Sequence, residues 1–388
     1  METMEEDEQL ELELDASNDM DVDDSEDFSA SPSPSSQPSP LGAEHNPEDV
    51  KTMPIYENGR YRNPWKTWQR PKLTNLFKLL FCTTKDKSGI PGKAELDATL
   101  PVLEPDISMF DKSPPSGIRH LWIGHSTSLI QFDGVTILTD PVFSDRCSPI
   151  KFVGNKRFRS TPCTIDALPK VDLVLISNAN YDHLDYASVI ALKERYGDEL
   201  QWYVPMGLKK WMNGCGCNNV VEMTWWQTDV FYDDLNIVVA CTPCQHWAKR
   251  TAKDENKVLW CSWCVIGPLH SFHFTGDTAY CEGFKQIGRR FGPFTLSTIP
   301  IGAYSPRDIM GSMHSDPEQA VTIHEDLRSQ ASIGVHWGTF SLAYEPYLEP
   351  RELLEAEVEK RRMKPNSFFT VSHGEITLVG ADGYNDID

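Results

Sequence analysis

The sequence predicts an α/β protein in which two mixed β-sheets are covered on their outer faces by helices, an αββα sandwich. From about Arg119 onward, short apolar runs rich in branched and aromatic residues alternate with segments whose apolar residues recur every three or four positions. In addition, many of the runs end in polar residues, which can gather at one rim while the sheets stay apolar. A chain of 388 residues is long enough to bury such a core.

The predicted elements place one large domain at residues 115–388. An Asp133-Gly134 pair marks a tight hairpin turn between two of its strands. The predicted strands are His120–Ile123, Ser128–Phe132, Val135–Thr139, Leu173–Ser177, Gln201–Val204, Ile237–Thr242, Val258–Val265, Ser271–Thr275, Leu296–Ile301, Ala331–His336 and Phe368–Val371. The predicted helices are Tyr186–Arg195, Cys281–Phe291, Pro317–Ser329 and Arg351–Arg361.

Residues 1–50 are expected to form a disordered acidic tail. They contain 17 Asp and Glu residues and no Lys or Arg, and they include Ser-Pro pairs between Ser31 and Pro40. This composition buries too little apolar surface to offset chain entropy. A solvated tail is the simpler interpretation, and regulation through phosphorylation of the Ser-Pro pairs is the alternative.

The net charge of −21 belongs to this tail, because residues 51–388 carry 40 acidic side chains against 36 basic ones. A near-neutral domain lacks the basic excess of a nucleic-acid surface, so no nucleic-acid partner is expected. The sequence has no apolar run long enough for a spanning helix, and its acidic N-terminus is unlike a signal peptide. Ten cysteines without such a signal indicate mostly free thiols in a reducing compartment. We therefore expect an intracellular protein, soluble or peripheral to a membrane.

Residues 51–114 form a basic and aromatic segment, with nine Lys and Arg between Lys51 and Lys87. After Pro71, the spacing of the apolar residues predicts one face of a short amphipathic helix. This face rests on an anionic membrane surface, or it packs on the rest of the chain or on a second subunit. The candidate lipid-contacting residues of the segment are Trp65, Trp68, Phe77, Leu80 and Phe81.

A candidate metal site lies at the ends of predicted strands. The strand Leu173–Ser177 leads into a polar loop that ends in Asp182 and His183. Carboxylates and imidazoles are the ligands that zinc takes in hydrolytic sites, so their recurrence at strand ends predicts a metal site. The other candidates at strand ends are Asp140, His246, Asp277 and His336.

Two other motifs compete with this interpretation. Cys241-x-x-Cys244 and Cys261-x-x-Cys264 have the spacing of a zinc ribbon. Both pairs lie on extended apolar patterns without a turn, which favours buried thiols. Gly124-His125-Ser126-Thr127 would be the only basis for a serine hydrolase, and it lacks the Gly-x-Ser-x-Gly spacing.

Eight short motifs extend well beyond the candidate metal ligands, over roughly residues 54–375. They are Asn63-Pro64-Trp65, Trp122-Ile123-Gly124-His125, Lys156-Arg157-Phe158-Arg159, Tyr181-Asp182-His183-Leu184-Asp185-Tyr186, Gln245-His246-Trp247, Pro300-Ile301-Gly302-Ala303-Tyr304, His336-Trp337-Gly338-Thr339-Phe340 and His373-Gly374-Glu375. In these motifs the chain resembles the N-acylphosphatidylethanolamine-hydrolysing phospholipases D, zinc hydrolases of the metallo-β-lactamase superfamily.

The resemblance implies two zinc positions, only one of which keeps all its ligands. The family's second metal would be held by Asp182, His183, Asp277 and His336. Its first metal would use positions 178 and 180 together with His246, and Asp277 would bridge the two ions. The superfamily loop reads His-x-His-x-Asp-His, whereas this chain has Asn178 and Asn180 in place of the two histidines. An amide oxygen is a much poorer zinc ligand than an imidazole nitrogen, so we expect one tight zinc and one weak or empty position.

The resemblance also implies the reaction, in which hydroxide attacks phosphorus, an N-acylethanolamine leaves and phosphatidic acid remains. Asp182 and Asp277 would hold and orient the metal and its hydroxide. His314 matches a position near the substrate phosphate, beside Met313 where the family has Gln, and Tyr181 matches a wall of the site.

The family further implies a homodimer and membrane association of residues 65–81, on the cytosolic face of internal membranes, although the cytosol is also possible. The alternative to a weakened enzyme is a catalytically inactive lipid-binding relative with a single structural metal. Lactonase and ribonuclease activities fit less well, since neither explains the amphipathic segment.

Overall fold

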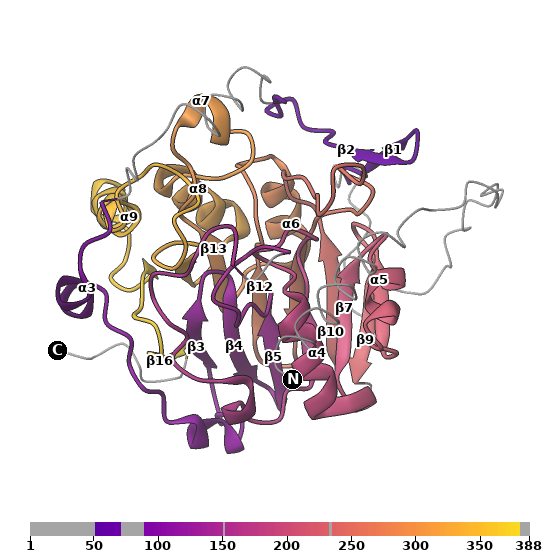
Figure 1. Ribbon diagram of the computed structural model, residues 1–388, viewed down its shortest axis with the longest axis horizontal. Coiled ribbons are helices and arrows are strands. Elements are labelled where there is room, and N and C mark those ends of the chain that lie inside the picture. Colours follow the sequence, from indigo (N-terminus) through magenta and orange to yellow (C-terminus); the bar gives the residue numbers. More distant parts are fainter. Residues whose placement is uncertain (1–50, 71–88, 150–151, 233–234, 381–388) are drawn as a thin grey trace. The chain divides into compact units, whose positions relative to one another are not determined.

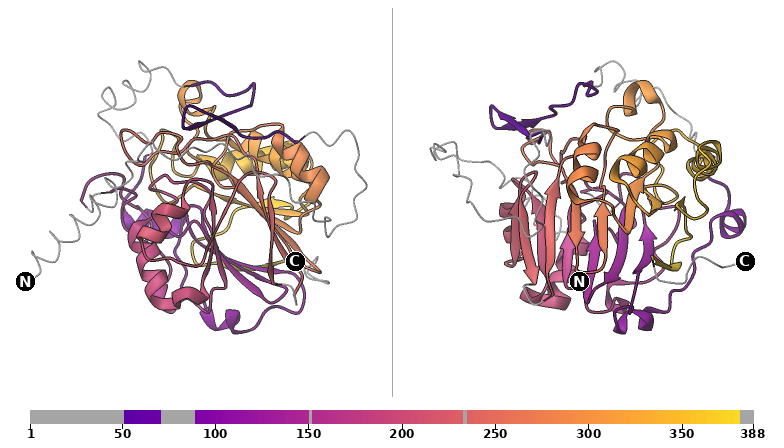
Figure 2. Two further views of the ribbon diagram at one scale, coloured as in Figure 1. Left: turned by 90° about the vertical axis from the view of Figure 1, so that its right-hand side faces the viewer. Right: turned by 180° about the vertical axis from the view of Figure 1, so that it is seen from behind.

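Two β-sheets of seven strands each make up the centre of the described chain, which comprises residues 51–70, 89–149, 152–232 and 235–380 of the computed structural model. The strand order is β16-β3-β4-β5-β6-β7-β8 in the first sheet and β15-β14-β13-β12-β11-β10-β9 in the second (Figure 1). Helices α4 and α5 lie outside the first sheet, and α6, α8 and α9 lie outside the second (Figure 2). The predicted αββα sandwich is therefore confirmed, while its acidic tail lies outside the described residues.

The elements have the following bounds. The strands of the first sheet are β3 (Ile118–Gly124), β4 (Thr127–Phe132), β5 (Val135–Thr139), β6 (Leu173–Leu175), β7 (Gln201–Pro205), β8 (Val220–Met223) and β16 (Ile376–Val379). The strands of the second sheet are β9 (Thr228–Tyr232), β10 (Ile237–Thr242), β11 (Ser262–Ile266), β12 (Ser271–Phe274), β13 (Leu296–Pro300), β14 (Ala331–Val335) and β15 (Phe368–Phe369). The helices are α3 (Lys93–Thr99), α4 (Tyr186–Tyr196), α5 (Lys209–Gly214), α6 (Gly283–Phe291), α7 (Arg307–Met310), α8 (Pro317–Leu327) and α9 (Glu349–Lys360).

The strand topology places one group of loops at a single edge of the sandwich. Strands β5 to β8 are parallel to one another, and so are β12 to β15. The carboxyl ends of parallel strands meet at the same edge of a sheet, and ligand sites form there. The loops that follow β5, β6, β12 and β14 carry Asp140, Asp182, Asp277 and His336 respectively.

The predicted hairpin turn is confirmed. Strands β4 and β5 pair antiparallel as far as Phe132 and Val135, which leaves a two-residue connection. Asp133 and Gly134 have φ angles of 47° and 85°, in the left-handed region that this turn requires. Strands β4 and β5 are buried on both faces, because helices cover the outside of the sheet.

The core of the protein is rich in aromatic side chains. The largest fully buried ones are Trp122, Trp202, Trp225, Trp260, Trp263, Tyr203, Phe132, Phe272, Phe274, Phe284 and Phe294. Indole N–H groups at such depth need acceptors. Trp263 Nε1 of β11 donates to the carbonyl of Ile176 at 2.8 Å, which joins the second sheet to the start of the loop that contains Asp182.

One predicted strand begins later than expected. The prediction was Val258–Val265, but β11 begins at Ser262. Before Ser262 the backbone bonds to loops of the first sheet, since Leu259 N donates to Met206 O and Cys261 N donates to Ser177 O. Shorter elements that the sequence analysis did not predict include β8, β9, β16, α3, α5 and α7.

From Thr52 onward, the described residues belong to one compact unit, which includes the described part of the 52–114 segment. Its first strands, β1 (Ile55–Glu57) and β2 (Arg60–Arg62), form a hairpin, and Tyr61 N donates to Asn256 O at 2.7 Å. The predicted amphipathic helix, with Phe77, Leu80 and Phe81, lies outside the described residues. Among the helices that are described, none is long and apolar enough to cross a membrane.

Trp65 does not present its ring to a lipid surface, contrary to the expectation from the sequence. Its side chain is buried, and its ring stacks on that of Trp225 with centroids 6.0 Å apart. Trp65 Nε1 donates to the carbonyl of Cys244 at 3.0 Å. The indole therefore anchors the N-terminal segment on the second sheet.

Candidate metal centre

The loop after β6 is fixed at both ends before it presents its polar side chains. At its start, Ser177 N and Ser177 Oγ donate to the carboxylate of Asp140 at 2.7 and 2.5 Å. At its end, the amides of His183 and Leu184 both donate to the carbonyl of Asn180, which closes a tight turn. Asp182 and His183 therefore leave the turn at defined positions.

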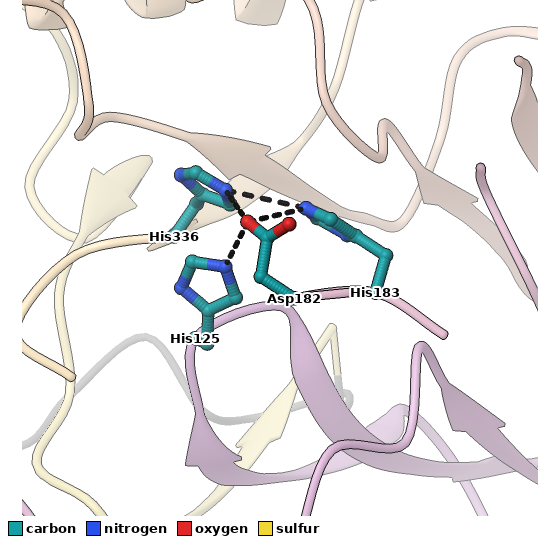
Figure 3. A group of neighbouring side chains, drawn as sticks. All are labelled: His125, Asp182, His183 and His336. Carbon is teal, nitrogen blue, oxygen red and sulfur yellow. Dashed lines mark hydrogen bonds and ion pairs between the residues drawn. The ribbon is translucent and has the colours of Figure 1, made fainter. Parts of the chain in front are cut away.

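Three ligand atoms lie at the corners of a nearly equilateral triangle (Figure 3). His183 Nε2 is 3.3 Å from His336 Nε2 and 3.3 Å from Asp182 Oδ2, and His336 Nε2 is 3.5 Å from Asp182 Oδ2. Zinc bonds of about 2.0–2.1 Å in a tetrahedron require ligand atoms about 3.3–3.4 Å apart. The triangle therefore matches one face of a tetrahedral site without rearrangement.

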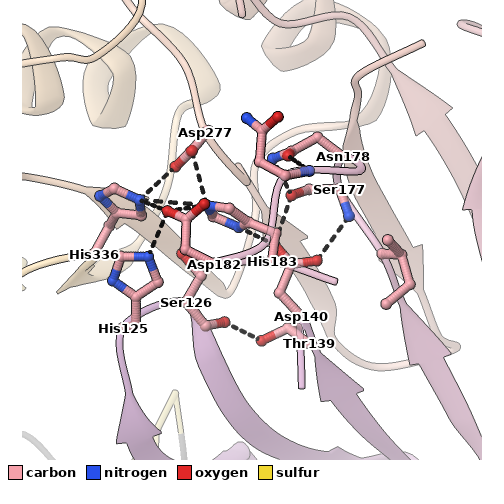
Figure 4. Close-up of polar contacts among 12 residues, drawn as sticks. His125, Ser126, Thr139, Asp140, Ser177, Asn178, Asp182, His183, Asp277 and His336 are labelled. Carbon is pink, nitrogen blue, oxygen red and sulfur yellow. Dashed lines mark hydrogen bonds and ion pairs between the residues drawn. The ribbon is translucent and has the colours of Figure 1, made fainter. Parts of the chain in front are cut away.

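Two of these ligand side chains are held from behind by further residues (Figure 4). His183 Nδ1 lies 2.6 Å from Asp140 Oδ2, so the proton on Nδ1 leaves Nε2 free for a metal. His125 Nε2 lies 3.0 Å from Asp182 Oδ2. Asp140, one of the polar residues noted at strand ends, lies behind His183. His125 was not assigned to the site, although it lies directly after a strand and within one of the motifs that carry the resemblance; its ring lies in the same group of possible ligands as Asp182, His183 and His336.

The backbone at three of these residues is strained. His125, Asp140 and His336 have φ angles of 54°, 31° and 61°, a region that residues with a side chain rarely adopt. The amide of His336 donates to the carbonyl of His125 at 3.0 Å, which couples two of the strained residues. Strain of this kind persists only where surrounding contacts hold it, and it gathers at functional sites.

The centre has two halves: the first contains Asp182, His183 and His336, and the second contains Asn178, Asn180 and His246. Asp277 lies between them. Its Oδ2 lies 2.7 Å from His183 Nε2 and 3.3 Å from His246 Nε2, and its Oδ1 lies 2.9 Å from His336 Nε2. The carboxylate is buried, so it faces imidazoles on both sides and almost no solvent. This is the bridging position that the resemblance implies for Asp277.

The electrostatics of this half favour a bound cation. Burial alone would lower the pKa of His183, but the carboxylates of Asp277, Asp182 and Asp140 outweigh it and hold the pKa well above its usual value. In His336, Asp277 and Asp182 likewise outweigh burial and raise the pKa to about 9. Burial would raise the pKa of Asp277, yet His183, His336 and His246 hold it well below its usual range. Converging carboxylates therefore demand positive charge, which protons or a metal ion supply.

The other half of the centre contains the two asparagines, and hydrogen bonds fix their orientation. Asn178 Oδ1 accepts from Asn180 N at 2.8 Å, and Asn178 Nδ2 donates to Ser177 Oγ. Asn180 Oδ1 accepts from Lys249 N at 2.8 Å, so its nitrogen faces the site. Asn180 Nδ2 lies 3.1 Å from His246 Nε2 and donates to it. We call this set of bonds the amide lock.

The amide lock occupies the ligand nitrogen of His246. His246 Nδ1 lies 3.0 Å from the carbonyl of Met313 and donates to it, so Nε2 carries the lone pair that accepts from Asn180. Burial lowers the pKa of His246, and Asp277 offsets this only in part, so the ring stays neutral. Asn180 thus presents a donor where a metal ligand would present a lone pair.

His314 lies between the two halves. Its ring centroid is 5.1 Å from that of His246 and 5.2 Å from that of His336, and its side chain is buried. His246, Asp277 and His314 form a group whose ligand atoms all lie within 4.8 Å of one another. Burial lowers the pKa of His314 to about 3, so the ring is neutral. It can exchange hydrogen bonds with a substrate but adds no positive charge.

The remaining expected contact residues lie at different depths. Tyr181 lies under the guanidinium of Arg250, whose Cζ is 4.1 Å from the ring centroid. The Met313 side chain is buried in an apolar cluster with Ala303, Ile309, Met310 and Ala343, which leaves only its carbonyl in the site. Trp68 packs partly on this cluster and lines a cavity of about 530 Å³.

The cysteines of the described residues are free thiols, and none belongs to a candidate metal group. Cys241 and Cys264 lie within β10 and β11, while Cys244 and Cys261 lie just outside these strands. All four are buried. Burial raises the pKa of Cys264 and Cys261 above the usual thiol range, which favours inert thiols.

Comparison with known proteins agrees with this geometry. Residues 135–337 match the beta-lactamase superfamily domain. The chain is 41% identical to N-acyl-phosphatidylethanolamine-hydrolyzing phospholipase D 1 of Caenorhabditis elegans, over 84% of this chain and 93% of that protein. It is 32% identical to the mitochondrial N-acyl-phosphatidylethanolamine-hydrolyzing phospholipase D of Saccharomyces cerevisiae, over 80% of this chain and 74% of that protein.

Solved structures share the fold at lower identity. An isothiocyanate hydrolase from Delia radicum gut bacteria aligns with a TM-score of 0.53 at 17% identity, over 68% of this chain and 99% of that chain. A metallo hydrolase from Ignicoccus hospitalis aligns with a TM-score of 0.51 at 20% identity, over 67% of this chain and 97% of that chain. These structures share the fold alone. The sequence relatives and the domain match show that the chain belongs to the N-acyl-phosphatidylethanolamine-hydrolyzing phospholipase D family of the beta-lactamase superfamily.

Proposed function

We propose that the protein is a zinc-dependent phospholipase D that hydrolyses N-acylphosphatidylethanolamines to N-acylethanolamines and phosphatidic acid, with one tightly bound zinc per chain. The observation that carries this proposal is the triangle of Asp182, His183 and His336, whose spacing fits zinc. The substrate class rests on the names of the two relatives that share most of this chain.

The residues divide the chemistry between them. When bound by Asp182, His183, His336 and Asp277, zinc would acidify water and polarise a phosphoryl oxygen. Asp182 and Asp277 orient that water, because their carboxylates are fixed by His125 on one side and by His183 and His336 on the other. Water attacks phosphorus, the bond from phosphorus to the ethanolamine oxygen breaks, and a proton goes to the leaving oxygen. Neutral His314 is the buried imidazole beside this position that can hold a phosphoryl oxygen.

The amide lock sets the expected rate. Two metals clamp the attacking and leaving oxygens together, whereas one metal loses half of that clamp. Removing a residue that merely supports a ligand costs about 10–100-fold in metal affinity or activity. Since two ligands are replaced here, the loss of activity should be larger, and we expect slow turnover.

A second candidate function is a catalytically inactive lipid-binding relative in which the single metal is structural. The hydrogen bond from Asn180 Nδ2 to His246 Nε2 favours it, because it satisfies the histidine without a second ion. The strained and buried Asp182 half favours the enzyme, since strain of this kind gathers at sites that act on a ligand.

The setting of the reaction is also part of the proposal. A peripheral position on the cytosolic face of internal membranes would deliver a phospholipid substrate, and a homodimer would frame an apolar entrance. Trp68, which lines the 530 Å³ cavity, supports lipid contact, and Asn63 of the same lining donates to the carbonyl of His246 at 2.8 Å. Arg60, Arg62 and Arg70 line the same cavity and suit an anionic headgroup.

The test is release of N-acylethanolamine from N-acylphosphatidylethanolamine in detergent micelles with zinc supplied. The matched control is the same chain with Asn178→His and Asn180→His. Slow release by the chain, with faster release by the control, supports a weakened enzyme. Release by the control alone identifies the inactive relative, and release by neither chain contradicts the substrate class.

A further inference from the structure

A metal-binding histidine almost always has a partner for its second ring nitrogen. Of the three histidines that the resemblance places at the metals, His336 is the one whose second nitrogen makes no hydrogen bond in the described structure; Nδ1 of the neighbouring His125 and His314 is likewise without one. His183 Nδ1 is held by Asp140 and His246 Nδ1 by the carbonyl of Met313. His336 Nδ1 is buried and makes no hydrogen bond within the described structure. Ligand histidines almost always donate this second N–H to a carboxylate, a carbonyl or a water, because the bond fixes the ring and its tautomer.

A small cavity lies beside His336. Its volume is about 30 Å³, and its lining includes His336, Ala303, Ser341 and Glu345. A cavity of about 10–15 Å³ suffices for one water molecule, provided that the water finds two to four polar partners. His336, Ser341 and Glu345 all carry polar side-chain atoms, so residues of the lining can supply these partners.

Glu345 is held in place with acceptor capacity to spare. Its Oε1 accepts from Ala303 N at 2.6 Å and its Oε2 accepts from Ser305 N at 3.0 Å. A carboxylate offers about four lone-pair positions, so each oxygen can accept a further bond. The two backbone bonds fix the carboxylate against the loop that follows β13, next to the segment that bears His336.

We propose that a water molecule bound in this cavity joins His336 Nδ1 to Glu345, and that Glu345 is thereby a positioning residue for the metal ligand His336. The imidazole N–H donates to the water, and the water donates to a carboxylate oxygen. With this bridge, the three histidines that the resemblance places at the metals have their second nitrogen satisfied: His183 by a carboxylate, His246 by a carbonyl and His336 by water. The inference rests on the metal site of the proposed function.

The test compares three variants for zinc affinity, measured by competition with a chromophoric chelator. Glu345→Gln removes the negative charge of the carboxylate that accepts a hydrogen bond from the water. Ser341→Val fills the cavity and leaves Glu345 unchanged. Glu349→Gln is the matched control, because Glu349 is a neighbouring glutamate that accepts from Tyr304 Oη and does not line the cavity. We expect Glu345→Gln and Ser341→Val each to weaken zinc binding about 10-fold, the lower end for such partners. Glu349→Gln should leave zinc binding unchanged.

A second readout separates positioning from loss of folding. In the cobalt-substituted protein, the exchangeable N–H protons of the two coordinated histidines give separate, paramagnetically shifted resonances. Glu345→Gln and Ser341→Val should move the His336 resonance and leave that of His183 in place, because Asp140 still holds His183. A partly unfolded variant would lose both resonances together.

Three outcomes would overturn the inference. They are unchanged zinc affinity in Glu345→Gln, an unmoved His336 resonance in that variant, or an effect of Glu345→Gln that Ser341→Val does not share. The last outcome would show that Glu345 acts through the loop at Ala303 and Ser305 instead of through water. If the unsubstituted protein bound no zinc, the proposed function would fail first, and the two failures are distinguishable.

Discussion

The two halves of the centre are built from one loop and share Asp277, yet they differ in what they leave unsatisfied. Around Asp182 and His183, carboxylate oxygens and imidazole nitrogens converge, and their charges call for a cation. Around Asn178 and Asn180, each donor meets an acceptor, and the chain of bonds ends at His246 Nε2. A metal site needs lone pairs left over, and the first half offers more of them, because the ligand nitrogen of His246 in the second half already accepts from Asn180.

The contrast shows that the loss of two metal ligands need not leave the remaining histidine without a hydrogen-bond partner. An unpaired buried polar group costs about 1–3 kcal/mol, so His246 without a metal would be a liability. Asn180 removes that liability with a neutral hydrogen bond, in an orientation enforced by the backbone of Lys249. The second half is therefore stable without an ion, whereas the first half is stable only with a cation or with protonated histidines.

The sharpest test of this difference is to remove one histidine from each half. His183→Ala takes away a corner of the tetrahedral face and should weaken zinc binding by more than about 100-fold, beyond the cost of losing a supporting partner. His246→Ala should keep one zinc per chain, because Nε2 of His246 already bonds to Asn180. Metal content after dialysis against a weak chelator checks both variants. Equal loss in the two variants would mean that the halves act as one site.

Restoring the two histidines should give the second half a complete set of zinc ligands. With Asn178→His and Asn180→His together, the zinc content should rise from one to two per chain, because three imidazoles and Asp277 then converge. Asn178→His alone should leave it at one, since Asn180 Nδ2 still donates to His246. Metal analysis of the single and double variants decides this, and two zinc ions in the unsubstituted chain would refute the amide lock.

The sequence predicted much of the fold because its longer elements carry a clear period. Helix α4 and strands β4, β5 and β10 lie within one residue of their predicted bounds. Strand β16 was missed because its partner is β3, at the other end of the domain, where Ile376 pairs with Leu121. The start of β11 was misplaced because an apolar run does not show whether its backbone joins a ladder or a neighbouring loop.

The candidate site was likewise predicted in part from the sequence. Asp182, His183, Asp277 and His336 follow strands, and the shared edge of the sheets brings them together, which sequence position alone suggests. His125 was missed because its bond to Asp182 spans 57 residues and depends on a positive φ. The orientation of Asn180 depends on Lys249, 69 residues away, so only the three-dimensional structure shows that the amide presents its nitrogen.

In the first half, a residue that supports a metal ligand should contribute less to zinc affinity than the ligand itself. In the second half, where no tight zinc is expected, such residues should not affect zinc affinity. His125→Gln shifts the donor that holds Asp182 and should weaken zinc binding by about 10–100-fold. Its control is His120→Gln, a buried histidine of β3 that bonds to Ser128 Oγ at 3.1 Å and lies outside the metal groups. Competition with a chelating dye measures both, and equal affinities in the two variants would show that His125 does not position Asp182.

The two halves should differ in how their histidines contribute to the pH dependence of zinc affinity. The pKa of His336 is raised to about 9, so at neutral pH this ring must lose a proton before it binds zinc. Zinc affinity should rise about tenfold per pH unit between about pH 7 and 9 for each proton released, as titration calorimetry in buffers of different ionisation enthalpy will show. His246, whose pKa is lowered, should add nothing to this slope. A flat profile would contradict the charges assigned to the first half.

The metal-free protein should show the opposite trend in stability. Because the folded pKa of His336 lies above the unfolded value of about 6.5, its contribution is fully present below that pH. The contribution is lost as pH rises through about 9. Denaturant unfolding without metal should therefore weaken over that window, while the zinc-loaded protein, whose ligand histidine has no proton to lose, should not follow it.

The smallest expected effect comes from the amide lock itself. Asn180→Ala leaves His246 Nε2 and Lys249 N without their partner, and because residue 180 is only partly buried, water replaces some of the lost bonds. We expect a loss of about 1 kcal/mol in the free energy of unfolding, measured with denaturant on the zinc-loaded protein. Zinc affinity should stay the same, because the triangle of Asp182, His183 and His336 does not include this amide. A gain in bound zinc would contradict this expectation. It would mean that His246, Asp277 and His314 can hold a second zinc ion and that the Asn180 amide had kept the ion out.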